Sequence, residues 1–167
     1  MAMLARNVSL TLGARKTLLE LQNKYAQRKM YLFKSAVDHN KYLLADVSGE
    51  DSIFNAGLDY EVVKFSHFKD IQKEDYFELR YLTLDNDEQK VFNSVMEGWH
   101  SEHTQPLGLA ESVVLRSKYK SYEYLLVNIW QHEHDYMAWC NSQKNELINF
   151  GHGGNQKPIV AEYVLAK

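Results

Sequence analysis

Hydrophobic and polar residues alternate with two different periods in the C-terminal part of the chain. Residues 75–84 (DYFELRYLTL) are rich in aromatic residues and alternate, which predicts a β-strand. Asp85 and Glu88 follow with the spacing of a capping box, which predicts the start of a helix that ends before Pro106, near His103. The apolar positions behind this box recur at helical spacing and form one stripe: Val91, Phe92, Val95, Met96 and Trp99.

The alternation of predicted strands and helices continues to the end of the chain. Residues 109–116 and 122–130 are predicted strands, joined by the polar turn 117–121 (SKYKS). A second helix should follow, with Tyr136, Trp139, Cys140 and Leu147 roughly on one side, and end at the glycines of residues 151–154. Residues 159–165 are the last predicted strand. The order βαββαβ indicates an α+β, ferredoxin-like domain, in which two helices cover one face of an antiparallel sheet.

The second face of that sheet also needs a cover, because an exposed apolar sheet face would be a sticky surface. We expect the N-terminal part of the chain to supply it. Its pattern predicts a strand at 7–12, a helix at 14–25, a hairpin of 30–36 with 41–47, and a short helix rather than a strand at 58–65. This divides the chain into an N-terminal α/β extension, residues 1–70, and a ferredoxin-fold domain, residues 71–167.

Composition and charge narrow the classes of function. The chain has 167 residues, of which 45% are hydrophobic and 13% aromatic, so it can bury a core. The net charge is −3 and no long basic run occurs, so nothing indicates nucleic-acid binding. A single cysteine, Cys140, excludes an internal disulfide and fits a reducing cytoplasm. We expect neither a signal peptide nor a membrane span, because no apolar run approaches roughly 20 residues.

Histidine and acidic residues cluster in His132-Glu133-His134-Asp135, which could be a metal site or the start of a helix. Acidic residues in a first helical turn are stabilised by the helix dipole, and no third ligand follows at metal-site spacing. We therefore favour the helix start. His100 and His103 could share a helix face, but solvated side chains explain them better than a metal pair does.

Trp130 and Trp139, with Tyr136 between them, allow two interpretations. Both indoles could simply pack on the sheet, as large aromatic side chains commonly do. Alternatively, Trp139 could line a pocket for a flat apolar ligand.

The pattern of Trp130, Tyr136 and Trp139, together with the strand ending in LTL at 82–84, resembles the antibiotic biosynthesis monooxygenase superfamily. The haem-degrading branch of the HmoB and IsdG type is similar, as is the related staphylococcal TRAP protein. The similarity extends upstream through LGARKTLLELQ, MYLFKSAVDHNKYLLADVSGEDSIF and DYEVVKF, and so covers nearly the whole chain. It implies a fold of the dimeric α+β barrel superfamily, in which residues 1–70 mimic the second subunit.

The resemblance also implies candidate site residues. The haem-degrading proteins use an Asn on the first strand of the domain, a Trp on the last helix, and a later His that ligates iron. Trp139 matches, whereas Arg80 stands in place of the Asn and Asn149 in place of the His. His152 lies three residues beyond Asn149, and a small insertion would place its imidazole where the family has its iron ligand. Trp139 and Arg80 are thus the catalytic candidates, and His152, Asn149 and Trp139 the haem-binding candidates.

The Arg80 side chain allows two interpretations. Its guanidinium could contact a ligand carboxylate, such as a propionate. It could instead lie at a strand edge, or pair with Glu78 or Glu111.

Three functions remain open. The first is a monooxygenase-like protein that binds or degrades haem, with a small planar hydrophobic ligand and an incomplete catalytic set. The second is a non-catalytic, TRAP-like stress or regulatory protein of the same fold. The third is a cofactor-free monooxygenase that acts on an aromatic substrate. The chain could act as a monomer or as a homodimer.

Overall fold

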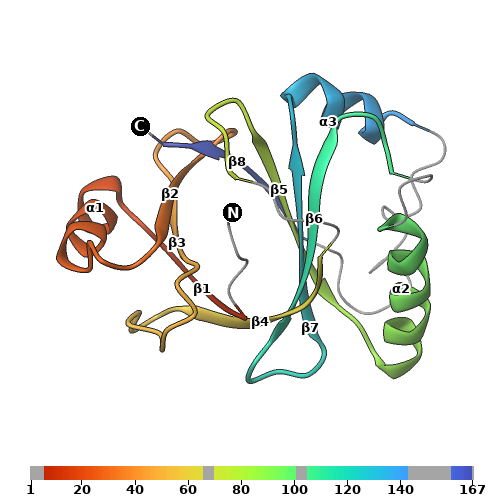
Figure 1. The fold of residues 1–167 in the computed structure, drawn as a ribbon, viewed down its shortest axis with the longest axis horizontal. Helices are drawn as coiled ribbons and strands as arrows, with labels where there is room; N and C mark the ends of the chain where they lie inside the picture. Colours follow the sequence, from red (N-terminus) through yellow and green to blue (C-terminus); the bar gives the residue numbers. More distant parts are fainter. Residues whose placement is uncertain (1–5, 66–69, 101–104, 143–158, 167) are drawn as a thin grey trace.

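The structure is a computed structural model that describes residues 6–65, 70–100, 105–142 and 159–166. Strands and helices follow one another along the chain with these bounds: β1 Asn7–Gly13, α1 Arg15–Lys24, β2 Met30–Ser35, β3 Tyr42–Asp46, β4 Leu58–Phe65, β5 Tyr76–Thr83, α2 Asn86–Trp99, β6 Leu109–Ser117, β7 Glu123–Trp130, α3 Glu133–Cys140 and β8 Ile159–Leu165 (Figure 1).

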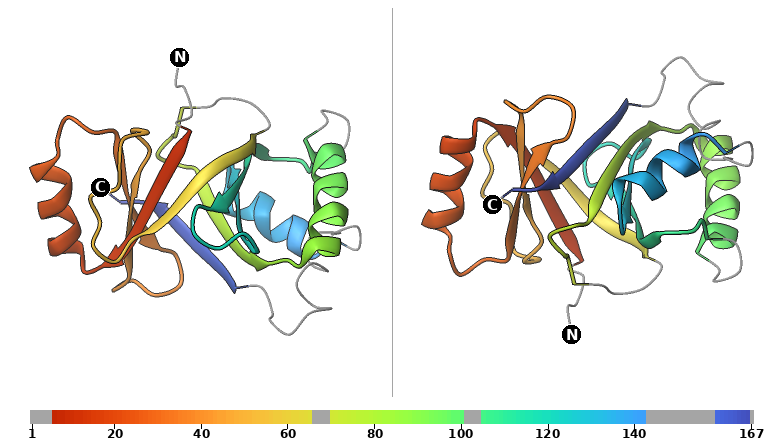
Figure 2. Two further views of the ribbon diagram at one scale, coloured as in Figure 1. Left: turned by 90° about the horizontal axis from the view of Figure 1, so that it is seen from below. Right: turned by 90° about the horizontal axis from the view of Figure 1, so that it is seen from above.

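The strands form one closed barrel in the order β1-β3-β2-β8-β5-β7-β6-β4, and neighbouring strands are antiparallel. Helices α2 and α3 lie outside the barrel against the sheet of β5, β6 and β7, whereas α1 lies outside on the opposite side (Figure 1). Two further views show the same separation (Figure 2). The chain therefore has an α+β architecture with a shared interior and a helical layer at each end.

The two parts of the barrel have the same strand order. The N-terminal strands are arranged β4-β1-β3-β2, and the C-terminal strands are arranged β8-β5-β7-β6, so each strand has a counterpart four strands later. The pairs β2–β8 and β4–β6 join the two parts. Helix α1 corresponds to α2, but residues 47–57, where a counterpart of α3 would lie, form no helix. The expected βαββαβ order is present from β5 to β8.

Side-chain alternation along the strands produces three apolar clusters. The barrel interior is filled from both parts of the chain, for example by Leu10, Phe33, Phe77 and Leu125. Under α2 and α3, the outer face of the sheet packs around Phe92, Trp130 and Trp139, among others. Under α1, a smaller cluster is built from Leu18, Met30, Leu32 and Leu44.

Most of the predicted strands and the N-terminal helix are confirmed, with bounds that differ by one or two residues. The second helix of the C-terminal part is predicted to reach the glycines of residues 151–154, but α3 ends at Cys140 with Asn141 as its C-cap, and Leu147 and the glycines lie outside the described residues.

The prediction of a short helix at 58–65 is wrong, because this segment is strand β4, which pairs with both β1 and β6. Its β-branched Val62 and Val63 favour an extended backbone, and an irregularity between Val62 and Lys64 interrupts the alternation that would have revealed it.

Two predicted helix starts are confirmed. Asp85 caps α2 in a capping box with Glu88, and residues 132–135 begin α3. Helix α2 ends at Trp99, with His100 as its C-cap, whereas His103 lies outside the described residues. No helix of the described residues is long and apolar enough to cross a bilayer.

Candidate functional site

Strand β5 places two opposite charges between the sheet and the C-terminal helices. Its residues Phe77 and Leu79 face the barrel interior, whereas the alternate residues Tyr76 and Leu82 pack in the helix-covered cluster. Glu78 and Arg80 have the same parity as the second pair. Glu78 is 0% exposed and Arg80 is 5% exposed, so both charged groups are buried in this layer.

A row of polar side chains runs across three neighbouring strands. Glu78 on β5 is in register with Asn128 on β7, which is in register with Ser112 on β6. The Asn128 Nδ2 donates to Glu78 Oε1 at 3.0 Å, and the Ser112 hydroxyl donates to Asn128 Oδ1 at 2.8 Å. Asn128 and Ser112 are fully buried, so the row satisfies polar groups that would otherwise be costly to bury.

All three tryptophans of the chain surround this row. The Trp99 indole donates to the Ser112 hydroxyl at 3.0 Å, and the Trp130 indole donates to Glu78 Oε1 at 3.3 Å. The ring of Trp139 lies 5.3 Å from that of Trp130 and 5.5 Å from that of Trp99, centroid to centroid. The polar row is therefore enclosed by flat aromatic surfaces, a low-dielectric surrounding in which its hydrogen bonds are strong.

Arg80 lies where the ionic and aromatic parts of the layer meet. Its Nη2 donates to Glu78 Oε2 at 2.6 Å, and its Cζ lies 5.8 Å from the centre of the Trp139 ring. The buried Nε of Arg80 has no hydrogen-bond acceptor among the described residues. A guanidinium has five N–H donors, and a buried donor without an acceptor is costly. Arg80 can therefore offer a charge-assisted hydrogen bond to an anionic group that enters this layer.

Protonated tyrosine and cysteine side chains line another part of the same layer. Tyr76 donates its hydroxyl to Glu162 Oε1 at 2.6 Å, and its ring lies 5.5 Å from that of Tyr136. Burial raises the pKa of the Tyr136 phenol, and the nearby Glu78 carboxylate raises it further. Burial also raises the pKa of the Cys140 thiol. Both groups consequently stay protonated near neutral pH, and Cys140 lacks the lowered pKa of a reactive thiolate.

The structure brings together Trp139 and Arg80, the two predicted catalytic candidates. Arg80 also pairs with Glu78, one of the partners expected for it. Asn149 and His152 lie outside the described residues, so their roles in binding haem or iron remain predictions. The rings of His132 and His134 stack at 5.1 Å, and the side chain of His134 is 79% exposed.

Trp99, Ser112 and Asn128 are site residues that sequence reasoning missed. Asn128 carried a usable signal, because it is a polar residue within an otherwise apolar strand and has the same parity as Trp130. A buried amide at such a position needs hydrogen-bond partners, and these are supplied by the strands on either side.

Solved structures with the same arrangement of barrel and helices include a ferredoxin-fold protein related to antibiotic biosynthesis monooxygenases. One similar solved structure is such a protein from Listeria monocytogenes, with a TM-score of 0.80 and 16% identity, covering 99% of this chain and 96% of that chain. A haem-degrading enzyme from Listeria monocytogenes has a TM-score of 0.76 and 17% identity, covering 96% and 99%. A major regulator of staphylococcal pathogenesis has a TM-score of 0.75 and 11% identity, also covering 96% and 99%.

These identities show a common fold and nothing narrower. No protein-family model matches the chain, and no curated protein matches it by sequence. The predicted superfamily resemblance is confirmed at the level of the fold, over almost the whole length of the chain. The same fold occurs in a haem-degrading enzyme and in a regulator, so the fold alone does not identify a ligand.

Proposed function

We propose that the protein is a monooxygenase-like protein that binds a planar, anionic aromatic ligand between α2, α3 and the sheet, with haem as the expected ligand. The observation that supports this most directly is Arg80. Its guanidinium is buried against the Trp139 indole, and its Nε has no acceptor among the described residues. A cation in aromatic surroundings suits a ligand with a flat apolar body and a carboxylate edge.

The chemistry of the described residues suits the organic part of haem, and the Trp139 and Tyr136 side chains, which are buried here, would move apart to admit it. Trp139 and Tyr136 offer aromatic surfaces to a porphyrin ring, and Arg80 offers a donor to a propionate. Glu78 would act as a positioning residue, because its ion pair holds the guanidinium beside the Trp139 ring. Haem, when bound, would supply the chemistry of oxygen activation. His152 is the proposed iron ligand, with Asn149 close to it in the sequence, and this assignment rests on the resemblance alone.

A specific observation favours a second candidate, a non-catalytic protein of the same fold. The Glu78 carboxylate already accepts hydrogen bonds from Arg80, Asn128 and Trp130. The three indoles also pack against one another through Trp139. In this candidate the protein's own side chains fill the layer, and the ionic network is part of the core.

Titration of the full chain with haemin separates the two candidates. If the site binds haem, the absorption spectrum should show a shifted Soret band that saturates at one equivalent. His152→Ala should change the position of that band, whereas His134→Ala serves as a control because its imidazole is exposed. A haemin spectrum that the protein leaves unchanged would refute the proposal and favour the non-catalytic candidate.

Arg80→Gln tests the contact with the ligand separately from the iron. A lost charge-assisted hydrogen bond should weaken haemin affinity by roughly 10- to 100-fold. Arg116→Gln is the matched control, because Arg116 pairs with Glu61 at the surface of the barrel and lies outside the proposed site. Equal affinities in the two variants would contradict the role of Arg80 while leaving the assignment of His152 standing.

We further propose that residues 1–70 take the place of a second subunit. One chain then completes the barrel by itself and can act as a monomer. The matching strand orders of the two parts support this, as does the closure of the barrel within one chain. Light scattering on the protein as it elutes from a size-exclusion column should give the mass of a single chain, 19.5 kDa. A dimer that persists on dilution would contradict this proposal.

A further inference from the structure

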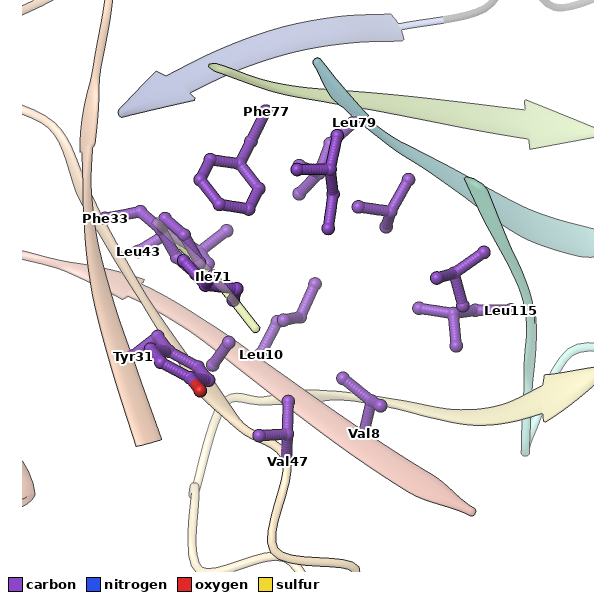
Figure 3. A pocket seen from close by; sticks show the side chains of 14 residues that line it. Val8, Leu10, Tyr31, Phe33, Leu43, Val47, Ile71, Phe77, Leu79 and Leu115 are labelled. Atoms are coloured by element: carbon purple, nitrogen blue, oxygen red, sulfur yellow. The ribbon is translucent and has the colours of Figure 1, made fainter. Parts of the chain in front are cut away.

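The interior of the barrel contains a cavity on the opposite side of β5 from Arg80. Its volume is about 110 Å³, and it is lined by residues of both parts of the chain (Figure 3). Val8, Leu10 and Phe33 contribute from the N-terminal strands, and Phe77, Leu79 and Leu115 from the C-terminal strands. In Figure 3 these side chains surround a central space, with Phe77 and Leu79 extending into it from one wall.

The lining is almost wholly apolar. Its residues are Val, Leu, Ile, Phe and Ala, with the single exception of Tyr31, whose hydroxyl is the one polar side-chain atom of the lining. An ordered water needs about two to four polar partners, and one hydroxyl does not supply them. A cavity of roughly 150 Å³ with a similar apolar lining stays dry and accepts benzene or xenon. The barrel cavity has the lining for such a ligand, a size approaching that volume, and a partly open side through which a ligand can enter.

We propose that this cavity is a binding site for a small, neutral, apolar molecule of about the size of benzene. The site is separate from the proposed haem site, because Phe77 and Leu79 face the cavity, whereas Glu78 and Arg80 face α2 and α3. It goes beyond the proposed function and does not depend on it. The ligand would replace empty space with van der Waals contacts to both parts of the barrel.

Benzene is the probe for the first experiment, with methyl NMR spectra of the full chain as the measurement. We expect shifts that saturate with benzene concentration at the methyl groups of Val8, Leu10 and Leu115, which line the cavity. The methyl groups of Leu18 and Leu44 provide an internal control, because they pack under α1 on the outer face of the barrel. Shifts that fail to saturate, or that are equal at both sets of methyl groups, would overturn the proposal.

Filling the cavity is the second experiment. Ala45 lines the cavity, whereas its neighbour Leu44 faces the opposite side of the same strand. Ala45→Leu should lower benzene affinity by at least about tenfold, and Leu44→Met should leave it within about twofold. Val127→Leu is a second filling variant, for use if Ala45→Leu does not fold. Filled variants that bind benzene as tightly as the unaltered chain would show that the ligand lies elsewhere and overturn the proposal.

Discussion

The outer faces of the two parts of the barrel differ, although the strands beneath them are arranged in the same order. Under α1 the buried cluster is built from Leu18, Met30, Leu32 and Leu44. Under α2 and α3 the corresponding layer buries an ion pair, an amide, a hydroxyl and the indoles of Trp130 and Trp139, with Trp99 partly buried beside them. The cluster beneath α1 is apolar, and polar contacts lie beside it: Gln22 of α1 donates to the Met30 carbonyl, and Arg28 pairs with the buried Asp46.

Buried charges are expensive, and well-packed apolar residues of similar volume are often as stable or more stable. The N-terminal part buries a charge at Asp46, whose partner Arg28 is 13% exposed, whereas both members of the Glu78–Arg80 pair are buried. The proposed binding of an anionic ligand at Arg80 would give this buried ion pair a role besides folding. Substitutions in each layer test this difference.

The largest effect is expected from Glu78→Ala, which leaves the buried Arg80 guanidinium without its carboxylate. Removing one member of a buried ion pair typically costs about 3–5 kcal/mol, and we expect a loss of that size here. Denaturant unfolding followed by tryptophan fluorescence measures it. A loss below about 1 kcal/mol would show that Arg80 is stabilised by other groups.

The double substitution Glu78→Leu with Arg80→Leu is the control for this effect. It removes both charges and leaves apolar side chains of moderate size in their place. We expect it to recover part of the stability lost in Glu78→Ala, because no uncompensated charge remains, whereas the buried Asn128 and Trp130 donors still lack the Glu78 acceptor. The same double variant should lose haemin affinity, which separates the ligand role of the pair from its structural role.

Leu44→Ala in the N-terminal layer is also expected to lower the free energy of unfolding. It should not change haemin affinity. Leu44 is 0% exposed and packs beneath α1. Truncating a buried leucine to alanine costs about 2–5 kcal/mol, depending on how far the site collapses. Haemin titration of this variant should match that of the unaltered chain. A weaker haemin affinity would mean that the two layers are coupled across the barrel.

Local patterns were sufficient to predict most elements, since each is encoded by neighbouring residues. The alternation of β5 and the capping box of α2 are examples. Strand β4 was missed because its irregularity between Val62 and Lys64 interrupts the alternation. Barrel closure depends on the long-range pairs β2–β8 and β4–β6, which no local pattern specifies.

The same distinction applies to the candidate site. Trp139 and Arg80 could be predicted because a resemblance points to single positions. Asn128 and Ser112 join the site only through the register that aligns each of them with Glu78 across β7 and β6. A shift of one residue would send these side chains to the barrel interior, so their role follows from strand pairing and not from the residues themselves.

A smaller effect is expected at the helix starts, where the two parts also differ. Asp85 caps α2 through the Glu88 backbone N–H, whereas Ala14 at the start of α1 has no side-chain hydrogen bond. Asp85→Ala should lower the free energy of unfolding by about 1 kcal/mol, and Ala14→Asp should raise it by a similar or smaller amount. Asp87→Ala, in the first turn of α2, is the control and should cost only a few tenths. Equal losses at Asp85 and Asp87 would indicate that charge near the helix start matters more than the cap.

The smallest effect at neutral pH is expected in the shared interior, at Tyr60 of β4. Burial raises the pKa of this phenol to about 12, from its ordinary value of 10.0, and the charge of Glu123 adds to the shift. Below pH 10 the phenol is neutral in both the folded and the unfolded chain. Between pH 10 and 12 the unfolded chain loses this proton while the folded chain keeps it, so stability falls as pH rises through that window.

Tyr60→Phe should therefore leave stability near pH 7 almost unchanged and make its decline between pH 10 and 12 less steep. Tyr119→Phe is the matched control, because Tyr119 is 79% exposed and should leave the decline as it is. Burial also raises the pKa values of Tyr81 and Tyr163, so the decline should become shallower without disappearing. Urea unfolding at a series of pH values measures the slope. An unchanged slope in Tyr60→Phe would mean that the Tyr60 hydroxyl is hydrated, and that the interior is less dry at β4 than its apolar lining at Phe77 and Leu79 implies.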